Sequence, residues 1–428
     1  MLFRSAQDMS AAEFSLVKTL IEINEGLRVI AVGDDDQNIY EFRGSSSGHF
    51  RSLLDVRGAV KYELLENYRS SANIVEFANG FARQISTRLK TKPIIPAKTE
   101  NGAISICKLK SENIAIPVVN AILDIKPSGS TCIAARTNAE AFNITGLLLR
   151  SGISARLIQS NNDFGLLNLV EFRDFVEYLD AGDDGYTIDD ESWRDAIAGL
   201  NREYSGSTNL QSVLKLIRDF ENSGGKTKYK SDLKQYIRES SLEDLESGAG
   251  GAVLVSTIHQ TKGREFDNVF LAYGGFMGAD DETRRAVYVA ITRAKRNLHI
   301  FCNGGYFDRI GAEGLVRTAD DTDYPGPSLI CLQLSHKDVA LGHFKNWRRF
   351  IDTLVSGQEL TIGETGCFLG DSMIVKFSVK FIADMAQLKE QGYAPAKASV
   401  RHIVYWQGKD MDEEIKIVLP NVEFALGT

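Results

Sequence analysis

Short apolar runs alternate with amphipathic segments over the first three quarters of the chain. One of the amphipathic segments, residues 70–85, could be capped by Ser70 or Ser71 and carries an apolar helical face. That face consists of Ile74, Ala78, Phe81 and Ile85. The apolar runs have the length and bounds of buried strands, and they lie at residues 28–32, 131–136, 252–257, 268–273 and 297–302. This alternation predicts an α/β fold built on a parallel sheet.

Two changes of pattern divide the chain. Residues 161–251 contain acidic and Gly/Ser-containing stretches between helical ones, which predicts a mostly helical insertion between the halves of one α/β domain, residues 61–160 and 252–310. After residue 311 a Pro-containing, linker-like stretch leads into a further region, residues 325–428, which we expect to be a small α+β extension. Residues 1–60 precede the α/β domain.

The extension carries its own signals. A helix is expected over Val379–Gln391, ended by Gly392, and two alternating strands at residues 401–406 and 415–420 predict a hairpin. His402 lies in the first of these strands and is expected to face solvent or a partner. Three further aromatic residues, His336, His343 and Trp347, fit a site, but a core role fits them better. The role of the extension stays unassigned.

Bulk composition narrows the function classes. The 428 residues give room for two or three domains, and the net charge of -8 argues against a polycation that coats nucleic acid. Local clusters of Lys and Arg could still bind it. The five cysteines are scattered, which indicates free thiols in a reducing compartment, so we expect a cytoplasmic protein. No apolar run approaches the roughly 20 residues of a membrane span, so no membrane partner is expected.

The stretch GDDDQNIYEFRG, residues 33–44, combines acids, an amide, two aromatic rings and Arg43. It follows the expected strand at 28–32 and should lie at the carboxyl end of a sheet. Three aspartates suggest a metal site, but adjacent side chains in such a segment point in different directions. Gln37 could orient a water or a phosphate oxygen, and Tyr40 and Phe42 could stack bases. The alternative is a polar loop with two buried aromatic residues.

Two further stretches carry candidate ligand contacts. Tyr68 and Arg69, just before a helix, could stack a base and clamp a phosphate, or form a surface Arg beside a half-buried Tyr. In STIHQTKGREFD, Thr257 and His259 could contact a nucleic-acid backbone, and Glu265 could accept a hydrogen bond from a ribose hydroxyl. The same loop contains Gly263. A single His is more often structural, and no paired spacing for a metal is present.

The last stretch, DETRRAVYVAITRAKRN, is a short apolar helix surrounded by basic residues that leads into a strand. The basic residues are Arg284, Arg285, Arg293, Lys295 and Arg296. Arginine beside a nucleotide stabilises charge on a transferring phosphoryl group. Taken alone, such a run would be a solvated helix face.

Together and in this order, the four stretches resemble motifs III, IV, V and VI of superfamily 1 DNA helicases of the UvrD/Rep type, over about residues 6–303. The resemblance implies a RecA-like domain with a reduced insertion, preceded by a remnant of a first RecA-like domain at residues 1–60. It implies that ATP binds between two such domains and that the motor moves 3′→5′ on single-stranded DNA and at junctions with duplex.

The same resemblance implies roles for single residues. Gln37, Arg69 and Arg293 would reach the γ-phosphate, Tyr68 would stack on adenine, and Glu265, in the loop with Gly263, would hold the ribose. The DNA strand would meet a second set of residues, namely Tyr40, Phe42, Arg43, Thr257 and His259.

Two family features are missing from the sequence. The only GK[ST] triplet, Gly225-Lys226-Thr227, has Phe220 where a phosphate-binding loop needs glycine. Where motif II is expected stands RSAQD, with Arg4 and Ser5 in place of two acids, so no metal ligand is assigned and Asp8 is at most peripheral.

We therefore expect that ATP and Mg²⁺ serve the intact protein and that this chain alone neither binds them tightly nor hydrolyses ATP. It would be the C-terminal portion of a helicase whose first RecA-like domain is missing, or a subunit completed by a partner. The alternative is a DNA-binding or regulatory module without catalysis. The tail shows no carboxylate cluster of the nuclease kind.

Overall fold

The computed structural model forms two compact units. Unit 1 comprises Met1–Leu157 and Gly251–Gly326, and unit 2 comprises Ile158–Gly250 and Pro327–Thr428. The structure describes residues 2–24, 26–40, 44–56, 58–158, 164–180, 185–223, 227–240, 252–275, 278, 280–408 and 413–427. Phe42 and Arg43 lie outside the described residues. Among the described helices none is long and apolar enough to cross a membrane.

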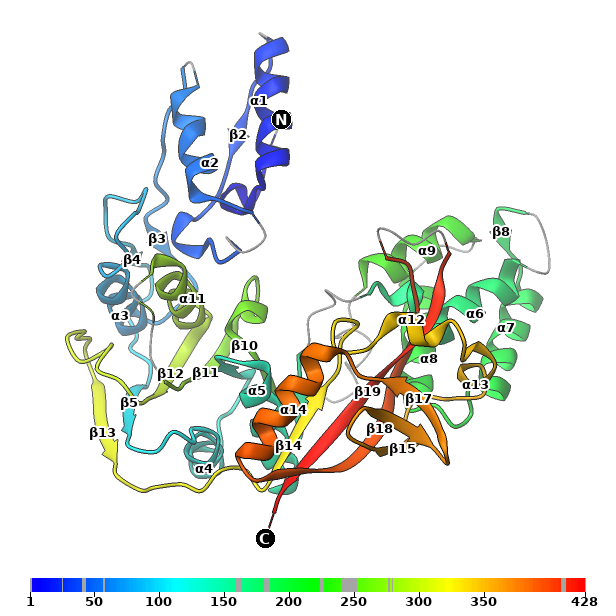
Figure 1. Cartoon of the computed structure of the whole chain (residues 1–428). Coiled ribbons are helices and arrows are strands. Elements are labelled where there is room, and N and C mark those ends of the chain that lie inside the picture. Colours follow the sequence, from blue (N-terminus) through cyan, green and yellow to red (C-terminus); the bar gives the residue numbers. More distant parts are fainter. Residues whose placement is uncertain are drawn as a thin grey trace. The chain divides into compact units, whose positions relative to one another are not determined.

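Unit 1 is built on a seven-stranded sheet in which every pair of neighbours is parallel (Figure 1). The strand order is β13-β5-β12-β11-β6-β10-β7. The strands are β5 (Ile104–Leu109), β6 (Thr131–Ala135), β7 (Ala155–Leu157), β10 (Val253–Thr257), β11 (Phe266–Tyr273), β12 (Ala294–Cys302) and β13 (Leu315–Asp320). The apolar runs expected at 131–136, 252–257, 268–273 and 297–302 are confirmed as neighbouring strands of this sheet.

Helices cover both faces of the sheet. The core on one face joins α3 (Ala72–Ala82) and α11 (Asp281–Ile291) to sheet residues such as Ala134 and Leu271. The core on the other face joins α4 (Ala115–Ile125) and α5 (Asn138–Arg150) to the alternate residues, such as Ile133 and Phe270. Because side chains alternate along a strand, continuous apolar runs supply both cores.

The expected apolar face is confirmed for Ile74, Ala78 and Phe81 of α3, and Ile85 is also buried although the helix ends at Ala82. The expected serine cap is wrong, because Ser71 occupies the N-cap position without a side-chain capping bond. The Ser70 hydroxyl donates instead to the Ala294 carbonyl at 2.7 Å, and the Ser71 hydroxyl to the Lys295 carbonyl at 3.2 Å. These bonds fasten the start of α3 to the start of β12.

The N-terminal part of unit 1 contains β1 (Leu2–Phe3), α1 (Ala11–Ile23), β2 (Ile30–Ala31) and α2 (Ser47–Ser52). The run at 28–32 does not form a buried strand as expected. Only Ile30–Ala31 pair, with β1, and Ile30 remains 62% exposed. A two-residue neighbour covers too little of the strand to bury its side chains.

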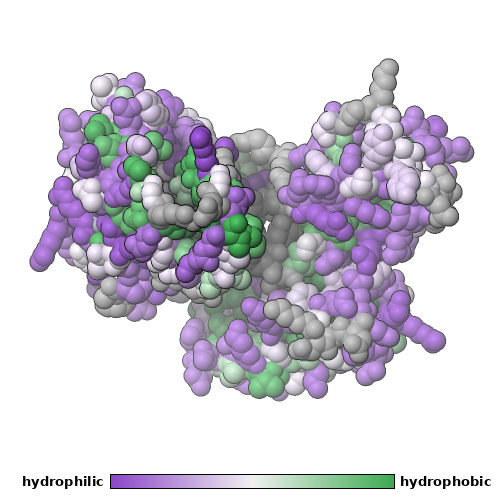
Figure 2. Space-filling view, turned by 90° about the horizontal axis from the view of Figure 1, so that it is seen from above, coloured by the Kyte–Doolittle hydropathy of each residue, from purple (hydrophilic) through white to green (hydrophobic). Residues whose placement is uncertain are grey.

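Apolar side chains are exposed over this part of unit 1. The space-filling view shows hydrophobic patches on an otherwise hydrophilic surface (Figure 2). The large hydrophobic residues that are exposed within the first 64 positions are Leu16, Ile23, Ile30, Val32, Leu54, Val60, Tyr62 and Leu64. Further on, β3 (Glu66–Asn67) pairs in parallel with β4 (Ile95–Pro96).

Unit 2 combines the helical insertion with the C-terminal region. The insertion supplies α6 (Val170–Asp180), α7 (Asp190–Glu203), α8 (Leu210–Ser223), α9 (Lys230–Glu239) and the short pair β8 (Thr187–Ile188) and β9 (Lys228–Tyr229). The C-terminal region supplies an antiparallel sheet in the order β14-β19-β18-β15-β16-β17. Its strands are β14 (Leu329–Gln333), β15 (Glu359–Ile362), β16 (Gly366–Leu369), β17 (Ser372–Lys376), β18 (Tyr393–Trp406) and β19 (Ile415–Leu426), and its helices are α12 (Leu341–Phe344), α13 (Arg348–Ile351) and α14 (Val379–Glu390).

One apolar core contains residues of both segments, among them Phe172, Phe175, Val404 and Val418. The expected helix and hairpin of the C-terminal region are confirmed as α14 and β18–β19, with Gly392 at a φ of +88° after α14.

The expectation that His402 faces solvent is wrong. Burial along β18 alternates through Ala398, Val400, His402 and Val404, so His402 belongs to the core-facing set of this strand. His402 is buried, lies edge-on to Phe164 and contacts the Asn209 amide at 3.2 Å.

Candidate functional site

The loop after β2 is held in place by its own aspartates and by Gln7. Asp34 caps the 3₁₀ helix Asp35–Gln37 by accepting from the Asp36 N–H at 3.1 Å. The Gln7 side chain accepts from the Asp34 N–H at 3.1 Å. A Cβ at Gly33 would come within 2.6 Å of that same Gln7 oxygen, so glycine permits the close approach.

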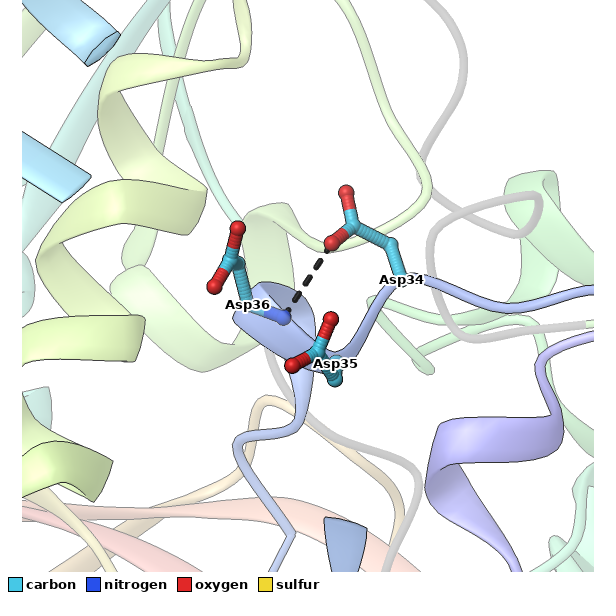
Figure 3. A group of neighbouring side chains, drawn as sticks. All are labelled: Asp34, Asp35 and Asp36. Atoms are coloured by element: carbon cyan, nitrogen blue, oxygen red, sulfur yellow. Dashed lines mark hydrogen bonds between the residues drawn. The ribbon is translucent and has the colours of Figure 1, made fainter. Parts of the chain in front are cut away.

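The three aspartates could hold a metal ion by proximity alone, since one ligand oxygen of each lies within 4.8 Å of the others (Figure 3). Each carboxylate nevertheless has protein partners. Arg88 binds Asp36 through two bonds of 2.8 and 2.6 Å, and Lys90 reaches Asp34 at 2.5 Å. The Leu89 N–H donates to Asp35 at 2.5 Å. We therefore assign the triplet to anchoring residues 88–90, and no metal is assigned to it.

The pKa values follow from these contacts. Burial raises the pKa of Asp36, but the hydrogen bonds and charges of Arg88 and Lys90 outweigh it and the net shift is downward. Asp35 is also buried but accepts only a backbone hydrogen bond and lies beside two other carboxylates. Its pKa is therefore raised.

Gln37 and Arg293 are in direct contact. The Arg293 guanidinium donates from Nη2 to the Gln37 side-chain oxygen at 3.0 Å, and the Gln37 amide donates to Asp34 at 2.8 Å. A series of hydrogen bonds therefore runs from Asp34 through Gln37 to Arg293, and it links the loop after β2 to the residue just before β12.

Arg293 is almost fully buried, with 3% of its surface exposed. Its Nε donates to the Val289 carbonyl at 3.0 Å and its Nη1 to the Arg264 carbonyl at 3.2 Å. Burial and, less strongly, the neighbouring charge of Arg69 lower its pKa to about 10. A buried cation bonded mainly to neutral oxygens is a strong site for an anionic oxygen.

Arg69 lies beside this cluster and is bound to Glu265. Its Nε and Nη2 reach the same Glu265 oxygen at 2.6 and 2.5 Å, and its Nη1 donates to the Thr292 carbonyl at 3.3 Å. The Asn67 side chain holds the turn by accepting from the N–H groups of Arg69 and Ser70. Tyr68 is 70% exposed, and its hydroxyl donates to Glu66.

A second ion pair ties the N-terminal segment to the loop after β10. Lys262 binds both oxygens of Asp8 at 2.6 and 2.7 Å and the Gln37 carbonyl at 2.7 Å. Its ammonium lies 4.6 Å from the centre of the Tyr40 ring. Burial raises the pKa of Asp8 and lowers that of Lys262, with the pairing opposing both shifts. In this structure Asp8 is thus a partner of Lys262.

The remaining predicted residues lie along the loop between β10 and β11. Thr257 is buried at the carboxyl end of β10, and His259 is half-buried in the following 3₁₀ helix Ile258–Thr261. Gly263 adopts a φ of +83°, which favours glycine. Glu265 and Arg293 directly precede β11 and β12, so they lie at the amino ends of these strands.

The structure thus brings together Gln37, Arg69, Glu265 and Arg293, and it puts Thr257 at the opposite strand end. The cluster also lies at the amino ends of β11 and β12 rather than at the carboxyl end of the large sheet.

Two arginines of the last stretch serve the fold. Arg284 donates to the Gln84 carbonyl at 2.7 Å and Arg285 to the Thr87 carbonyl at 3.1 Å, while Asp281 accepts from the N–H groups of Ser86 and Thr87. They hold the segment that carries Arg88 and Lys90. Sequence reasoning missed that segment, although the basic run RLK could have been matched with the acidic run DDD.

Chemically, the cluster offers two guanidinium groups and an amide next to an exposed aromatic ring and a carboxylate. The protein-family model described as UvrD-like helicase C-terminal domain matches residues 62–186 and 186–304, which is more than half of the chain. The chain belongs to the UvrD-like helicase family. The model described as UvrD/REP helicase N-terminal domain matches residues 4–55.

Similar proteins of this family are DNA helicases by name. DNA helicase II of Rickettsia typhi is 23% identical over 398 residues, covering 69% of this chain and 58% of that protein. ATP-dependent DNA helicase PcrA of Bacillus subtilis is 24% identical over 401 residues, covering 69% of this chain and 53% of that protein. The chain therefore spans little more than half the length of these curated relatives.

Among solved structures, the C-terminal domain of a possible DNA helicase from Lactobacillus plantarum covers 59% of this chain and 98% of that domain, with a TM-score of 0.30 and 14% identity. At that score the likeness supports no argument about the fold, which rests on the sheet and its two cores.

Proposed function

We propose that this chain is the C-terminal portion of an ATP-dependent 3′→5′ DNA helicase. It contributes contacts to adenine, ribose and the γ-phosphate and a surface for single-stranded DNA. The observation that carries the proposal is the convergence of Gln37, Arg69, Glu265 and Arg293 from four stretches that are distant in sequence.

The donor set fits a nucleoside triphosphate. Arg69 and Arg293 present guanidinium groups that match phosphate oxygens, and Gln37 adds an amide between them and Asp34. Glu265 can exchange its bond to Arg69 for a ribose hydroxyl, and the exposed Tyr68 ring offers a face for adenine. Bound ATP with Mg²⁺ would supply the phosphoryl group whose hydrolysis drives the motor.

The DNA contacts would lie on the other side of the loops that follow β2 and β10. Tyr40 and Thr257 are proposed to meet bases and backbone, together with His259 and with Phe42 and Arg43, which the structure does not describe. Lys262, which contacts Tyr40 and the Gln37 carbonyl, joins this region to the nucleotide contacts. A change at Gln37 would thereby reach the DNA side.

The partner proposed for unit 1 is the remainder of a first RecA-like domain, which would carry the phosphate-binding loop and the Mg²⁺-binding acids. Exposed Ile30, Val32, Tyr62 and Leu64 support this, because such side chains are normally covered by a neighbouring element. The sequence lacks a phosphate-binding loop of its own. That lack also favours the second candidate, a module that binds DNA without hydrolysing ATP.

The first experiment measures ATP hydrolysis by the purified chain with and without single-stranded DNA, with R293A as control. We expect no turnover, together with oligonucleotide binding that T257A/H259A weakens. Turnover that disappears in R293A would show a complete catalytic site within this chain. Absence of oligonucleotide binding would contradict the DNA-contacting role.

A second experiment separates the two candidates. Joining the chain to an upstream domain that carries a phosphate-binding loop should produce DNA-stimulated turnover that R293A removes. If the joined protein binds both ligands and still does not turn over, the non-catalytic module is the better description.

A further inference from the structure

A surface on unit 2 combines aromatic rings and exposed cations outside the segment matched by the helicase models. It consists of residues 343–350, HFKNWRRF, which comprise the end of α12, the following turn and most of α13. The family matches end at residue 304. We call this segment the aromatic-basic turn.

The aromatic-basic turn is anchored to unit 2 by buried side chains and by hydrogen bonds. Phe344 and Ile351 are buried in the core of unit 2, and backbone bonds close the turn, with the Trp347 N–H donating to the Phe344 carbonyl at 3.1 Å. The His343 ring contacts the Met373 carbonyl at 2.9 Å, which fixes it against β17. The backbone that carries the exposed side chains of the turn is therefore held in a defined conformation.

Three rings form a row along the turn. His343 and Trp347 are stacked with centroids 5.6 Å apart and an interplanar angle of 25°, and Trp347 and Phe350 follow at 5.0 Å and 48°. Phe350 ends the row and is 48% exposed. A large ring with half its surface in water at the end of a row leaves a face on which one more flat group can stack.

Three cations flank this row. Lys345, Arg348 and Arg349 are exposed, and no carboxylate among the described residues lies within ion-pair distance of any of them. The adjacent Asp352 is bound to Lys416 at 2.8 Å. Among the described residues, these three cations therefore have no acidic partner, although the whole chain carries a net charge of -8.

We propose that the aromatic-basic turn is a second contact for single-stranded nucleic acid, in which a base stacks on Phe350 while Lys345 and Arg349 bind the backbone phosphates. Rings that stack bases beside cations that follow the phosphates are the general arrangement of single-strand binding. Duplex DNA keeps its bases stacked on each other, so the exposed ring selects a strand with free bases. The inference rests on the proposed function, since it adds a DNA contact to the same protein.

The test uses the full chain and a fluorescein-labelled oligothymidine, with binding followed by anisotropy over a range of salt concentrations. K345A/R349A should flatten the dependence of log affinity on log salt by about 1.4, because each lost phosphate contact on a single strand removes about 0.7. The matched control K380A/K389A removes two lysines from α14 and should leave the slope unchanged.

F350A tests the stacking. It should weaken oligothymidine binding about fivefold or more and leave the binding of a blunt duplex unchanged. Thermal unfolding of each variant checks the fold, which should be retained because Phe350 is half exposed.

The outcomes separate this inference from the proposed function. If T257A/H259A weakens binding and neither K345A/R349A nor F350A does, the DNA contact is confined to unit 1 and the inference is wrong. If F350A weakens the binding of duplex and of oligothymidine equally, the proposal that Phe350 stacks on a free base is wrong. If the wild-type chain binds neither, both proposals fail.

Discussion

Arg293 donates a hydrogen bond to Gln37 at 3.0 Å across 256 residues of sequence. Both side chains are proposed to reach the γ-phosphate, and here each serves as the partner of the other. Binding of a nucleotide would therefore exchange this bond for bonds to phosphate oxygens. The loop after β2 would then be released from β12 and bound again through the ligand.

The bond between these residues should be measurable as a coupling. In a double-mutant cycle of Q37A and R293A, we expect a coupling of about 1–2 kcal/mol in the free energy of unfolding of unit 1, because a charged donor is involved. R293A alone should cost more than Q37A, since it also removes bonds to the Val289 and Arg264 carbonyls. Urea denaturation measures both, and strictly additive effects would contradict the coupling.

Asp36 should stabilise the fold through Arg88. Asp36 is fully buried, and D36N leaves the partly exposed Arg88 without its two-bond partner. We expect a loss of about 2 kcal/mol, less than for a fully buried pair. The control is E22Q, which breaks the exposed Lys18–Glu22 pair and should cost close to nothing.

The acid side of the stability curve provides a further check on Asp36. Its folded pKa is lowered, so its contribution is present above the unfolded pKa of about 4 and is lost as the pH falls through the folded value. D36N should therefore reduce the loss of stability below pH 4 compared with the wild type. An unchanged slope in urea titrations at these pH values would show that Asp36 is not linked to folding.

Tyr68 should matter for nucleotide binding and not for stability. Its ring is 70% exposed, so Y68A should leave the unfolding transition unchanged. In the chain joined to a phosphate-loop domain, Y68A should weaken ATP binding about fivefold or more, while Y68F retains the ring and the affinity. Y186A, which removes another exposed tyrosine, is the control. Equal affinity of wild type and Y68A would remove Tyr68 from the site.

His299 should make unit 1 sensitive to mild acid. It is buried against Phe270, bonded to the Ser105 hydroxyl at 2.8 Å, and burial lowers its pKa to about 4. Because the unfolded chain binds the proton first, stability is complete above about pH 6.5 and falls as the pH drops toward 4. The free energy of unfolding that is lost through protonation of His299 is at most about 3 kcal/mol.

H299Q removes this titration and should flatten the pH dependence of unfolding between pH 6.5 and 4. Hydrogen exchange of β5 and β12 amides over this range is the direct measurement. If H299Q is as acid-sensitive as the wild type, groups other than His299 cause the loss of stability.

Local patterns predicted four strands and one helix of unit 1. Four apolar runs became neighbouring parallel strands, and Ile74, Ala78 and Phe81 of α3 are buried as expected, together with Ile85, which follows the helix. These predictions depend on side-chain periodicity, which is a property of a few successive residues. The motif stretches also predicted the family, because their residue types and order are written in the sequence.

Contacts between distant segments were decided by the tertiary structure. The apolar run around Ile30 remained exposed because its strand has only a two-residue neighbour, and His402 lies on the core-facing side of β18 together with Val400 and Val404. The serines before α3 bonded to β12 carbonyls rather than capping the helix. In each case the outcome depended on which parts of the chain lie beside the segment, and not on its local preference.

The sequence by itself determined the family, and it predicted which side chains a nucleotide and DNA site would need, since these are residue types at fixed spacings. Only the tertiary structure decided that Gln37 contacts Arg293 and that Arg69 contacts Glu265. It also decided that the aspartates bind Arg88 and Lys90, and that insertion and C-terminal region share one core. The physical reason is that a hydrogen bond or a shared core needs two partners, and a pattern in one segment specifies only one of them.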